Sequence, residues 1–353
     1  MSDLSPGSTT TSTSPTGSQS TKSPPEPIGV DPAFQGTEGD DGEDSDIFDE
    51  VDTRSTFSVP EYISQFRRLH GRTYHNYQGA EYWGPNDDRQ NEGLDVAHHM
   101  MNVAMDGKLF LAPLNNPQKV LDVGTGTGIW AIDFADEHPG AIVIGTDISP
   151  IQPALVPSNC SFEIDNCELP WTYRDNTFDY IHIRGLVGCV RDWPGLYAEC
   201  LRTLKPGGWL EQQEYALPIA GNETPLPEDC VWHDWARIFR DAGARTRRSF
   251  DVTDHWHGWL REAGFTGRLH TDCIRLPIGG WAASAKWKQV GLLNSLSLEE
   301  GLDGFASYLC TAVLGWSEVE IELVLARVRS AIKNKAYHAF YPLQTIYIQK
   351  PPV

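Results

Sequence analysis

The sequence predicts a doubly wound α/β fold built on a mostly parallel sheet. From Lys119 onward, short apolar runs alternate with helical stretches, a pattern typical of βαβ units. The first apolar run passes directly into a glycine-rich turn and then into a helix, Val120 to Trp130. The chain has 353 residues, enough for one large α/β domain with insertions.

The expected elements follow this alternation along the chain. Strands are expected at residues 119–123, 142–146, 161–164, 178–183, 209–214, 268–276 and 340–349. Helices are expected at residues 129–137, 194–204 and 253–263. The second helix is followed by Lys205-Pro206-Gly207-Gly208, and proline and glycine end helices. The segment from Ala216 to Phe250 reads as a polar insert.

We divide the chain into a tail, a lid segment and a main domain. Residues 1–55 are rich in Ser, Thr, Pro and acids. Within residues 1–50, eleven acids face one lysine, giving −10 of the chain's total charge of −20. Such a segment has too little apolar surface to offset the entropy of ordering, so we predict disorder. Residues 116–353 form the main domain, with a helical insertion at about 281–335 that includes helices at 302–314 and 317–332.

Residues 56–115 precede the main domain and are expected to cover it. Glu61–Leu69 has helical apolar spacing, and a long half-buried helix follows Pro85-Asn86-Asp87. The aromatic residues between these helices include Tyr82 and Trp83, which we take as candidates for a lid over an acceptor pocket. The alternative is ordinary aromatic packing at a domain edge.

Charge and cysteine content exclude several classes of protein. The main part of the chain is also acidic, which argues against general attraction to nucleic acid or anionic membranes. No apolar run approaches the roughly 20 residues that span a bilayer. The seven cysteines are an odd number without a C-x-x-C pair, as in proteins of reducing compartments. We therefore expect no nucleic-acid or membrane partner, no metal, and a cytoplasmic and/or nuclear location.

The glycine turn predicts a nucleotide-like cofactor. Gly124, Gly126 and Gly128 allow a tight turn and close approach of a ligand, and the following helix offers free N–H groups. Dinucleotide-binding folds use the same device. Here, however, the spacing is G-x-G-x-G and Asp122 precedes it. A carboxylate repels a pyrophosphate but attracts the ammonium and sulfonium groups of S-adenosylmethionine, so we favour that cofactor over a nicotinamide.

The next two strands supply further cofactor candidates. Asp147 ends the second strand about twenty residues after the glycine turn, where a carboxylate can accept both ribose hydroxyls. Helix capping is the alternative role. Asp165 and Asn166 follow the third strand and are expected at the adenine amino group, with Ile148 stacked beneath the ring.

The fourth strand ends at the same edge of the sheet, where open α/β folds bind ligands. His182 and Arg184 lie there as candidates for contact with substrate or with the cofactor carboxylate, and a purely structural role is the alternative. Methyl transfer from a sulfonium requires alignment and exclusion of water more than a base. We therefore assign no catalytic residue.

These motifs, in this order, resemble those of a class I S-adenosylmethionine-dependent methyltransferase. The resemblance includes two further segments, Phe178-Asp179-Tyr180 and Leu204-Lys205-Pro206-Gly207-Gly208. The resemblance covers about residues 90–350. It implies a Rossmann-like, seven-stranded sheet in the order 3-2-1-4-5-7-6, with an antiparallel last strand.

A narrower resemblance is to the fungal LaeA-like methyltransferases. It is carried by Tyr82-Trp83-Gly84-Pro85-Asn86-Asp87, by Gly145-Thr146-Asp147-Ile148-Ser149-Pro150 and by Trp209-Leu210-Glu211-Gln212-Gln213-Glu214. Gly93 stands where a basic residue is expected. The resemblance implies methyl transfer to an O, N or S nucleophile of a small molecule, and we expect this acceptor to be a secondary metabolite. The alternative is a cofactor-binding regulator of secondary metabolism or development that acts through protein partners, as in a velvet-type complex, or on a protein substrate.

Overall fold

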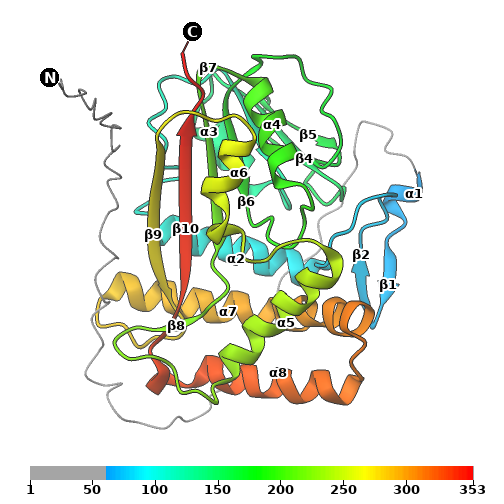
Figure 1. Cartoon of the computed structure of the whole chain (residues 1–353), viewed down its shortest axis with the longest axis vertical. Coiled ribbons are helices and arrows are strands. Elements are labelled where there is room, and N and C mark those ends of the chain that lie inside the picture. Colours follow the sequence, from blue (N-terminus) through cyan, green and yellow to red (C-terminus); the bar gives the residue numbers. More distant parts are fainter. Residues whose placement is uncertain (1–60, 353) are drawn as a thin grey trace, which may run out of the picture.

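The core of the protein is one mixed sheet. The computed structural model describes residues 61–352, so the predicted disordered tail lies outside the described residues. The strands of the sheet are β3 (Lys119–Val123), β4 (Ile142–Asp147), β5 (Cys160–Ile164), β6 (Phe178–Arg184), β7 (Leu204–Tyr215), β8 (Ala220–Gly221), β9 (Leu269–Pro277) and β10 (Ala339–Gln349). They run in the order β5-β4-β3-β6-β7-β10-β8, and β9 also pairs with β10 (Figure 1).

The strand order confirms the predicted fold class. Strands β3, β4, β5, β6 and β7 are parallel to one another. Strand β10 is inserted between β7 and β9 and is antiparallel to both. Numbered along the chain without the two-residue β8, the order is 3-2-1-4-5-7-6. All five parallel strands therefore end at one edge of the sheet.

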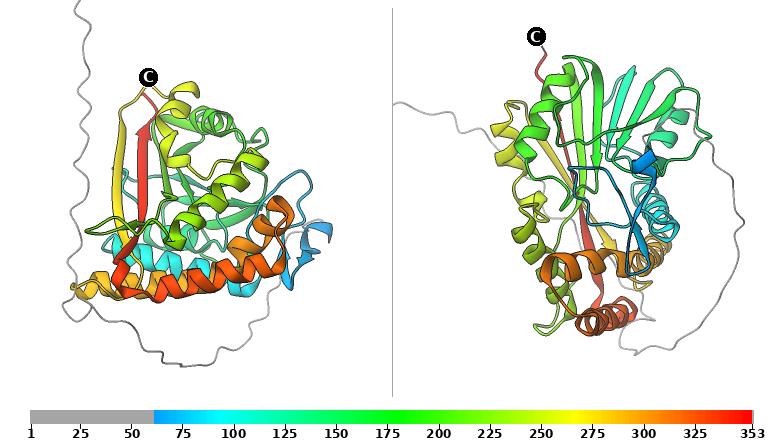
Figure 2. Two further views of the ribbon diagram at one scale, coloured as in Figure 1. Left: turned by 60° about the horizontal axis from the view of Figure 1, so that its bottom comes forward. Right: turned by 90° about the vertical axis from the view of Figure 1, so that its right-hand side faces the viewer.

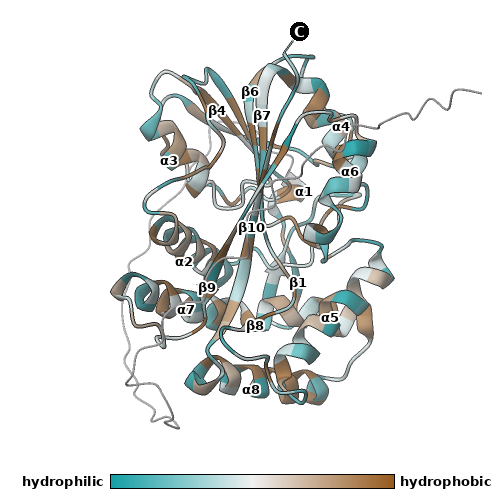
Figure 3. Ribbon diagram, turned by 60° about the vertical axis from the view of Figure 1, so that its left-hand side comes forward, coloured by the Kyte–Doolittle hydropathy of each residue, from teal (hydrophilic) through white to brown (hydrophobic). Residues whose placement is uncertain are grey.

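Helices cover both faces of this sheet. The helices are α1 (Glu61–Ser64), α2 (Asp88–Ala104), α3 (Ile129–Glu137), α4 (Trp193–Thr203), α5 (Val231–Thr246), α6 (Trp256–Glu262), α7 (Ala285–Tyr308) and α8 (Glu318–Lys333). Figure 3 shows α3 and α2 on one side of β10, and α4, α6 and α5 on the other. Trp130 and Phe134 of α3 pack on one face, and Trp193 and Trp256 pack on the other. The strands are therefore buried from both sides, as a parallel sheet requires.

A second helical layer extends the fold below the sheet. Helices α2, α7 and α8 lie one below another, and the long strands β9 and β10 reach down to them (Figures 1 and 2). A large apolar cluster joins α5, α7 and α8. Met100 and Met101 of α2 pack against Leu276 of β9 and Leu343 of β10. The segment before the sheet and the insertion at 281–335 thus form one covering layer.

Two local predictions were wrong. The expected helix Glu61–Leu69 ends at Ser64, and β1 (Arg67–Leu69) pairs with β2 (Arg72–Tyr74) in a hairpin. The intervening residues His70 and Gly71 both have positive φ, 48° and 80°, the geometry that a two-residue hairpin turn needs. The polar insert 216–250 contains α5, whose buried Trp232, Trp235 and Phe239 have helical spacing.

The late helices also differ in extent from the prediction. Helix α7 begins at Ala285, and its continuation Leu309–Leu314 is π-helical rather than a separate helix. Helix α8 begins with a capping box in which Ser317 and Glu320 bond reciprocally. Within residues 61–352, none of the helices combines the length and apolarity needed to cross a bilayer.

Candidate functional site

A pocket lies where the parallel strands end. Its floor is formed by the glycine turn after β3 and by the ends of β4 and β6, and its roof by α2 and by residues 80–86, which we call the strap. The predicted residues that line it are Asp122, Gly124, Gly126, Asp147, Ile148, Asp165, Asn166, Tyr82, His182 and Arg184. The structure therefore brings ten of the twelve candidates to one cavity, while Gly128 and Trp83 lie outside its lining.

The three glycines are required for different reasons. All three have positive φ: 70° at Gly124, 59° at Gly126 and 83° at Gly128. A Cβ at Gly124 would lie 2.5 Å from Leu186 Cδ2, and one at Gly128 would lie 2.3 Å from Phe162 Cζ. At Gly126 the nearest atom would be 3.8 Å away, on Leu94. Gly124 and Gly128 are thus needed for packing, whereas Gly126 leaves open space on the pocket side.

Asp122 is held inside the protein by two side chains. It is 3% exposed. Its Oδ2 accepts a hydrogen bond from Thr125 Oγ1 at 2.6 Å, and its Oδ1 accepts one from His182 Nδ1 at 2.7 Å. These bonds fix the glycine turn to β6. The carboxylate charge still faces the pocket, which suits a cationic ligand.

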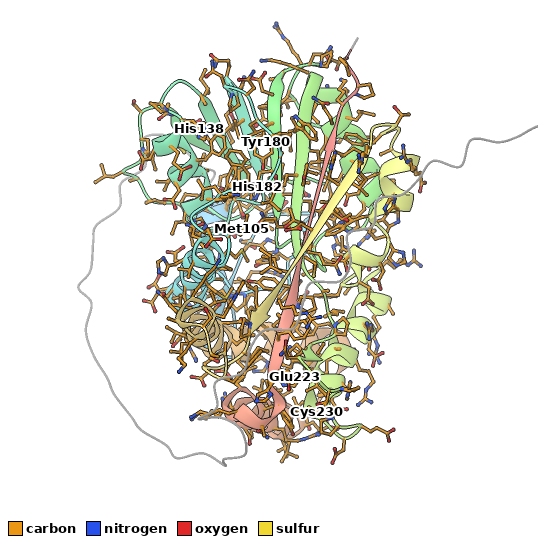
Figure 4. All side chains as sticks on the ribbon, turned by 90° about the vertical axis from the view of Figure 1, so that its left-hand side faces the viewer. Met105, His138, Tyr180, His182, Glu223 and Cys230 are labelled. Carbon is orange, nitrogen blue, oxygen red and sulfur yellow. The ribbon has the colours of Figure 1, made fainter. Side chains whose placement is uncertain are left out.

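His182 has a positioning role. It is fully buried, and its ring stacks on Trp130 with centroids 3.7 Å apart. Figure 4 shows it on β6 beside Tyr180, in the interior of the fold. Burial lowers the pKa of His182, and the bond to Asp122 opposes this shift. The ring is therefore neutral and donates to Asp122, in line with the structural alternative.

Asp147 lines the pocket at the end of β4. Its Oδ2 accepts from Gly126 N and its Oδ1 from Ser149 N, each at 2.9 Å. Burial raises the pKa of Asp147 to about 6, although these bonds lower it. Each carboxylate oxygen has two lone pairs, so both can still accept a hydroxyl. The capping role and the predicted ribose role are compatible.

Asp165 and Asn166 follow β5 and form the far end of the pocket. Asp165 Oδ1 accepts from Asn166 N at 2.8 Å, and Asn166 Oδ1 accepts from Glu168 N at 3.0 Å. Burial raises the pKa of Asp165, and Glu163 adds to the shift. One oxygen of Asp165 and the amide donor of Asn166 stay available, which matches the donor and acceptor edge of an adenine.

The two aromatic lid candidates have different surroundings. Tyr82 lines the pocket. Trp83 points away from it: its Nε1 donates to Val187 O at 2.9 Å, and its ring contacts Phe239, Phe250 and Phe305. The expectation that Trp83 shapes an acceptor pocket is therefore corrected, because its ring belongs to the apolar cluster that anchors the strap.

Several residues that complete the site were not predicted. Leu94, Ala97, His98 and Met101 lie on one face of α2 and line the pocket. Their spacing of three and four residues indicates an inward-facing stripe, and this was the available signal. Arg248 ties the strap to the domain, and no local motif marks it.

Arg248 forms a latch over the pocket. Its guanidinium is 4% exposed and pairs with Glu168 at 2.6 Å and with Glu81 of the strap at 3.3 Å. It also donates to Cys189 O at 2.9 Å. The strap is thus joined to the loop after β5 and to the pocket wall.

The pocket has an acidic character. Asp122, Asp147 and Asp165 line it, and Arg184 is the cation at its floor. Among the described residues, no cluster of three or more His, Cys, Asp or Glu side chains is suited to a metal ion. The arrangement favours a cationic organic ligand.

Comparisons with known proteins agree with this geometry. A family model for a methyltransferase domain matches residues 96–270. The chain is 36% identical to the methyltransferase pytC of Aspergillus terreus, over 85% of this chain and 93% of that protein. It is 32% identical to the probable methyltransferase tdiE of Emericella nidulans, over 75% and 83% of the two chains.

A third relative connects the chain to the narrower family. The chain is 32% identical to the protein-methionine methyltransferase laeA of Emericella nidulans, over 82% of this chain and 77% of that protein. The chain therefore belongs to the fungal LaeA-like family of class I S-adenosylmethionine-dependent methyltransferases.

Proposed function

We propose that this methyltransferase acts on an O, N or S nucleophile of a small molecule, in secondary metabolism. The observation that supports the proposal is the covered pocket. The strap closes it through the Arg248 latch and the Trp83 anchor. The wall beside Gly124 and Arg184 carries the apolar side chains of Leu186 and Met101. A small, mostly apolar acceptor fits such a site better than a folded protein surface does.

The cofactor would lie along the carboxyl edge of the sheet. Asp165 and Asn166 would hold the adenine, Asp147 the ribose hydroxyls, and Asp122 with the glycine turn the methionine end. When bound, S-adenosylmethionine supplies an activated methyl group. The residues of the chain orient it and exclude water, because the strap, α2 and Leu186 surround the pocket.

The second proposal is a regulator that acts through protein partners or a protein substrate. It is supported by relatives named secondary metabolism regulators, such as laeA of Aspergillus niger, 33% identical over 84% of this chain. The seven cysteines of the present chain are all free. This supports a cytoplasmic or nuclear location under either proposal.

A labelling experiment separates the two proposals. Purified chain would be incubated with methyl-labelled S-adenosylmethionine, once with a small-molecule extract and once with a protein extract of a fungal culture. We expect label in the small-molecule fraction, and less of it with an Asp147→Asn variant assayed at a low cofactor concentration. Label in a protein alone, dependent on intact Asp147, would replace the first proposal by the second.

A further inference from the structure

A second cavity adjoins the cofactor pocket, and we call it the outer cavity. It lies between the β1–β2 hairpin, the chain leading into the strap, the loop after β5 and the start of α4. Its volume is about 600 Å³, within the roughly 300 to 1,000 Å³ that is usual for small-ligand sites. Its lining includes Arg67, Tyr77, Leu169, Arg191, Arg248 and Tyr308.

Two guanidinium groups in the outer cavity lack a carboxylate partner. Among the described residues, the side chain of Arg67 bonds only through Nε, to His75 O at 2.8 Å. The guanidinium of Arg191 forms no hydrogen bond or ion pair within residues 61–352, although its backbone N donates to Glu168 Oε1 at 2.7 Å. A guanidinium has five N–H donors. Both side chains can therefore donate to a ligand.

The three carboxylates that line the outer cavity already have partners. Glu168 lies 2.6 Å from Arg248, and Glu81 lies 3.3 Å from the same guanidinium. Asp192 is the N-cap of α4 and accepts from Gly195 N at 2.9 Å. None of the three pairs with the two free guanidinium groups. The unpaired positive charge favours an anionic ligand.

The rest of the outer cavity offers aromatic and apolar surface. Tyr308 lies beside Tyr74, with ring centroids 5.8 Å apart, and Leu169 is 49% exposed. Burial raises the pKa of Tyr77, so its hydroxyl keeps its proton and can donate to an anion. Aromatic rings pack well on such surfaces. The cavity therefore fits an aromatic molecule that carries an anionic group.

The outer cavity and the cofactor pocket share a wall. Ala80, Glu81, Asn166 and Glu168 line both. Arg248 is buried, bonds to both glutamates and lines the outer cavity. Glu81 is the more distant and the more exposed of its two partners. An anion in the outer cavity can therefore replace Glu81 beside Arg248, which opens the latch of the strap.

We propose that the outer cavity is a second ligand site, for an aromatic carboxylate, and that its occupancy releases the strap. Arg67 and Arg191 bind the carboxylate, and Tyr77, Leu169 and Tyr308 contact the ring. The ligand opens the latch and thereby lowers the affinity for the cofactor. By linkage, the cofactor lowers the affinity for the aromatic carboxylate by the same factor. The effect on the cofactor rests on the proposed function, whereas the binding of the carboxylate does not.

The first test compares two probes that have the same ring. 2-Naphthoate and the neutral 2-naphthamide would be titrated by calorimetry into the purified full chain. We expect wild type to bind the naphthoate about five- to tenfold more tightly, through charge-assisted hydrogen bonds. Arg191→Gln should bring the two affinities close together, and Arg67→Gln should reduce the difference. Arg268→Gln is the matched control, because Arg268 is exposed and lines neither cavity.

The second test measures the effect on the strap. With saturating 2-naphthoate, S-adenosylhomocysteine should dissociate from wild type about two- to fivefold faster in stopped-flow displacement, the effect of losing one partly exposed ion pair. In Glu81→Gln the naphthoate should add no further acceleration, because the arm that it displaces is already absent. Without naphthoate, Arg191→Gln should release S-adenosylhomocysteine at the wild-type rate.

Three results would overturn the inference. An unchanged preference for naphthoate in both arginine variants would place the carboxylate elsewhere. A naphthoate affinity that keeps falling as S-adenosylhomocysteine is raised would show competition for the cofactor pocket, whereas linkage between two sites levels off at a finite factor. An unchanged dissociation rate with naphthoate bound would show that the latch does not connect the two cavities.

Failure of the proposed function gives a different result. Folded chain that binds no S-adenosylhomocysteine would contradict that function, and with it the effect on the cofactor. The preference for naphthoate over naphthamide, and its loss in Arg191→Gln, would still support the second site.

Discussion

The Asp147 carboxylate shows how one residue serves both the fold and the site. Its two oxygens accept the backbone N–H groups of Gly126 and Ser149, so it holds the glycine turn against the loop after β4. Sequence position alone suggested either a cap or a ribose ligand. The structure supports a geometry in which both roles coexist, because the second lone pair of each oxygen remains free.

Asp147→Asn should weaken S-adenosylhomocysteine binding by about 2 kcal/mol, because a charge-assisted acceptor for ribose hydroxyls is replaced by a neutral amide. Calorimetric titration measures the effect. Asp251→Asn is the matched control, since Asp251 pairs with Arg240 on the surface and lines no part of the pocket. Equal affinity of Asp147→Asn and wild type would show that Asp147 is only a cap.

The raised pKa of Asp147 predicts a pH dependence. Burial raises it to about 6, so the carboxyl gains a proton as the pH falls through 6 and affinity for S-adenosylhomocysteine should fall with it. The cost of burying the charge is absent below pH 4 and present above pH 6. Asp147→Asn leaves one of the two backbone N–H groups without its acceptor at every pH. Relative to wild type, the variant should therefore be less stable at pH 4 than at pH 8, because only at pH 8 does it also remove the cost of the buried charge.

Titrations between pH 5 and 8, with thermal melts between pH 4 and 8, measure both effects. The difference between wild type and Asp147→Asn isolates Asp147 from Glu214, because burial raises the pKa of Glu214 to about 7 as well. A wild-type affinity that stays constant from pH 5 to 8 would contradict the assignment.

At the scale of elements, local sequence patterns predicted the strands and helices of the sheet better than the helices and the hairpin that cover it. The strand at 119–123 and the helix at 129–137 coincide with β3 and α3, because their apolar runs and glycine turn act locally. The helix expected at 61–69 failed because two positive-φ residues form a hairpin there. Helix α5 was missed because its polar face obscured the buried tryptophans.

The glycine turn gives a prediction for one element. Gly126→Ala should reduce cofactor affinity with a loss of only about 1 kcal/mol in stability, because its φ is left-handed but the space is open. Gly128→Ala should lose about 2 to 4 kcal/mol, because its Cβ would overlap Phe162. Urea unfolding and calorimetry measure the two quantities. Equal stability losses in both variants would contradict this distinction.

The strap gives a second prediction at this scale. Glu81→Gln removes the partly exposed arm of the Arg248 latch and leaves the Glu168 arm in place. S-adenosylhomocysteine should dissociate about two- to fivefold faster, since a pair of this exposure contributes about 0.5 to 1 kcal/mol. Stopped-flow displacement followed by tryptophan fluorescence measures the rate. An unchanged rate, with Asp251→Asn as control, would show that the latch does not limit release.

At the scale of the whole molecule, the sequence predicted the strand order through resemblance and the site through position along the chain. Each predicted cofactor carboxylate lies at or just beyond the carboxyl end of a parallel strand. Parallel strands end at one edge of the sheet, so the convergence of these carboxylates follows from topology. The roof could not be predicted in this way. Leu94 and His98 reach the pocket only because α2 packs on α7 and β9. Their helical spacing indicates a buried face of α2, but it does not indicate which part of the fold that face contacts.

The most direct test of this account is a calorimetric titration of the purified full chain with S-adenosylhomocysteine and, in parallel, with NADH. The acidic pocket and the G-x-G-x-G turn predict binding of S-adenosylhomocysteine with one site per chain and no binding of NADH, whose pyrophosphate would face Asp122 and Asp147. Binding of NADH, or of neither ligand by folded protein, would contradict the assignment of this pocket.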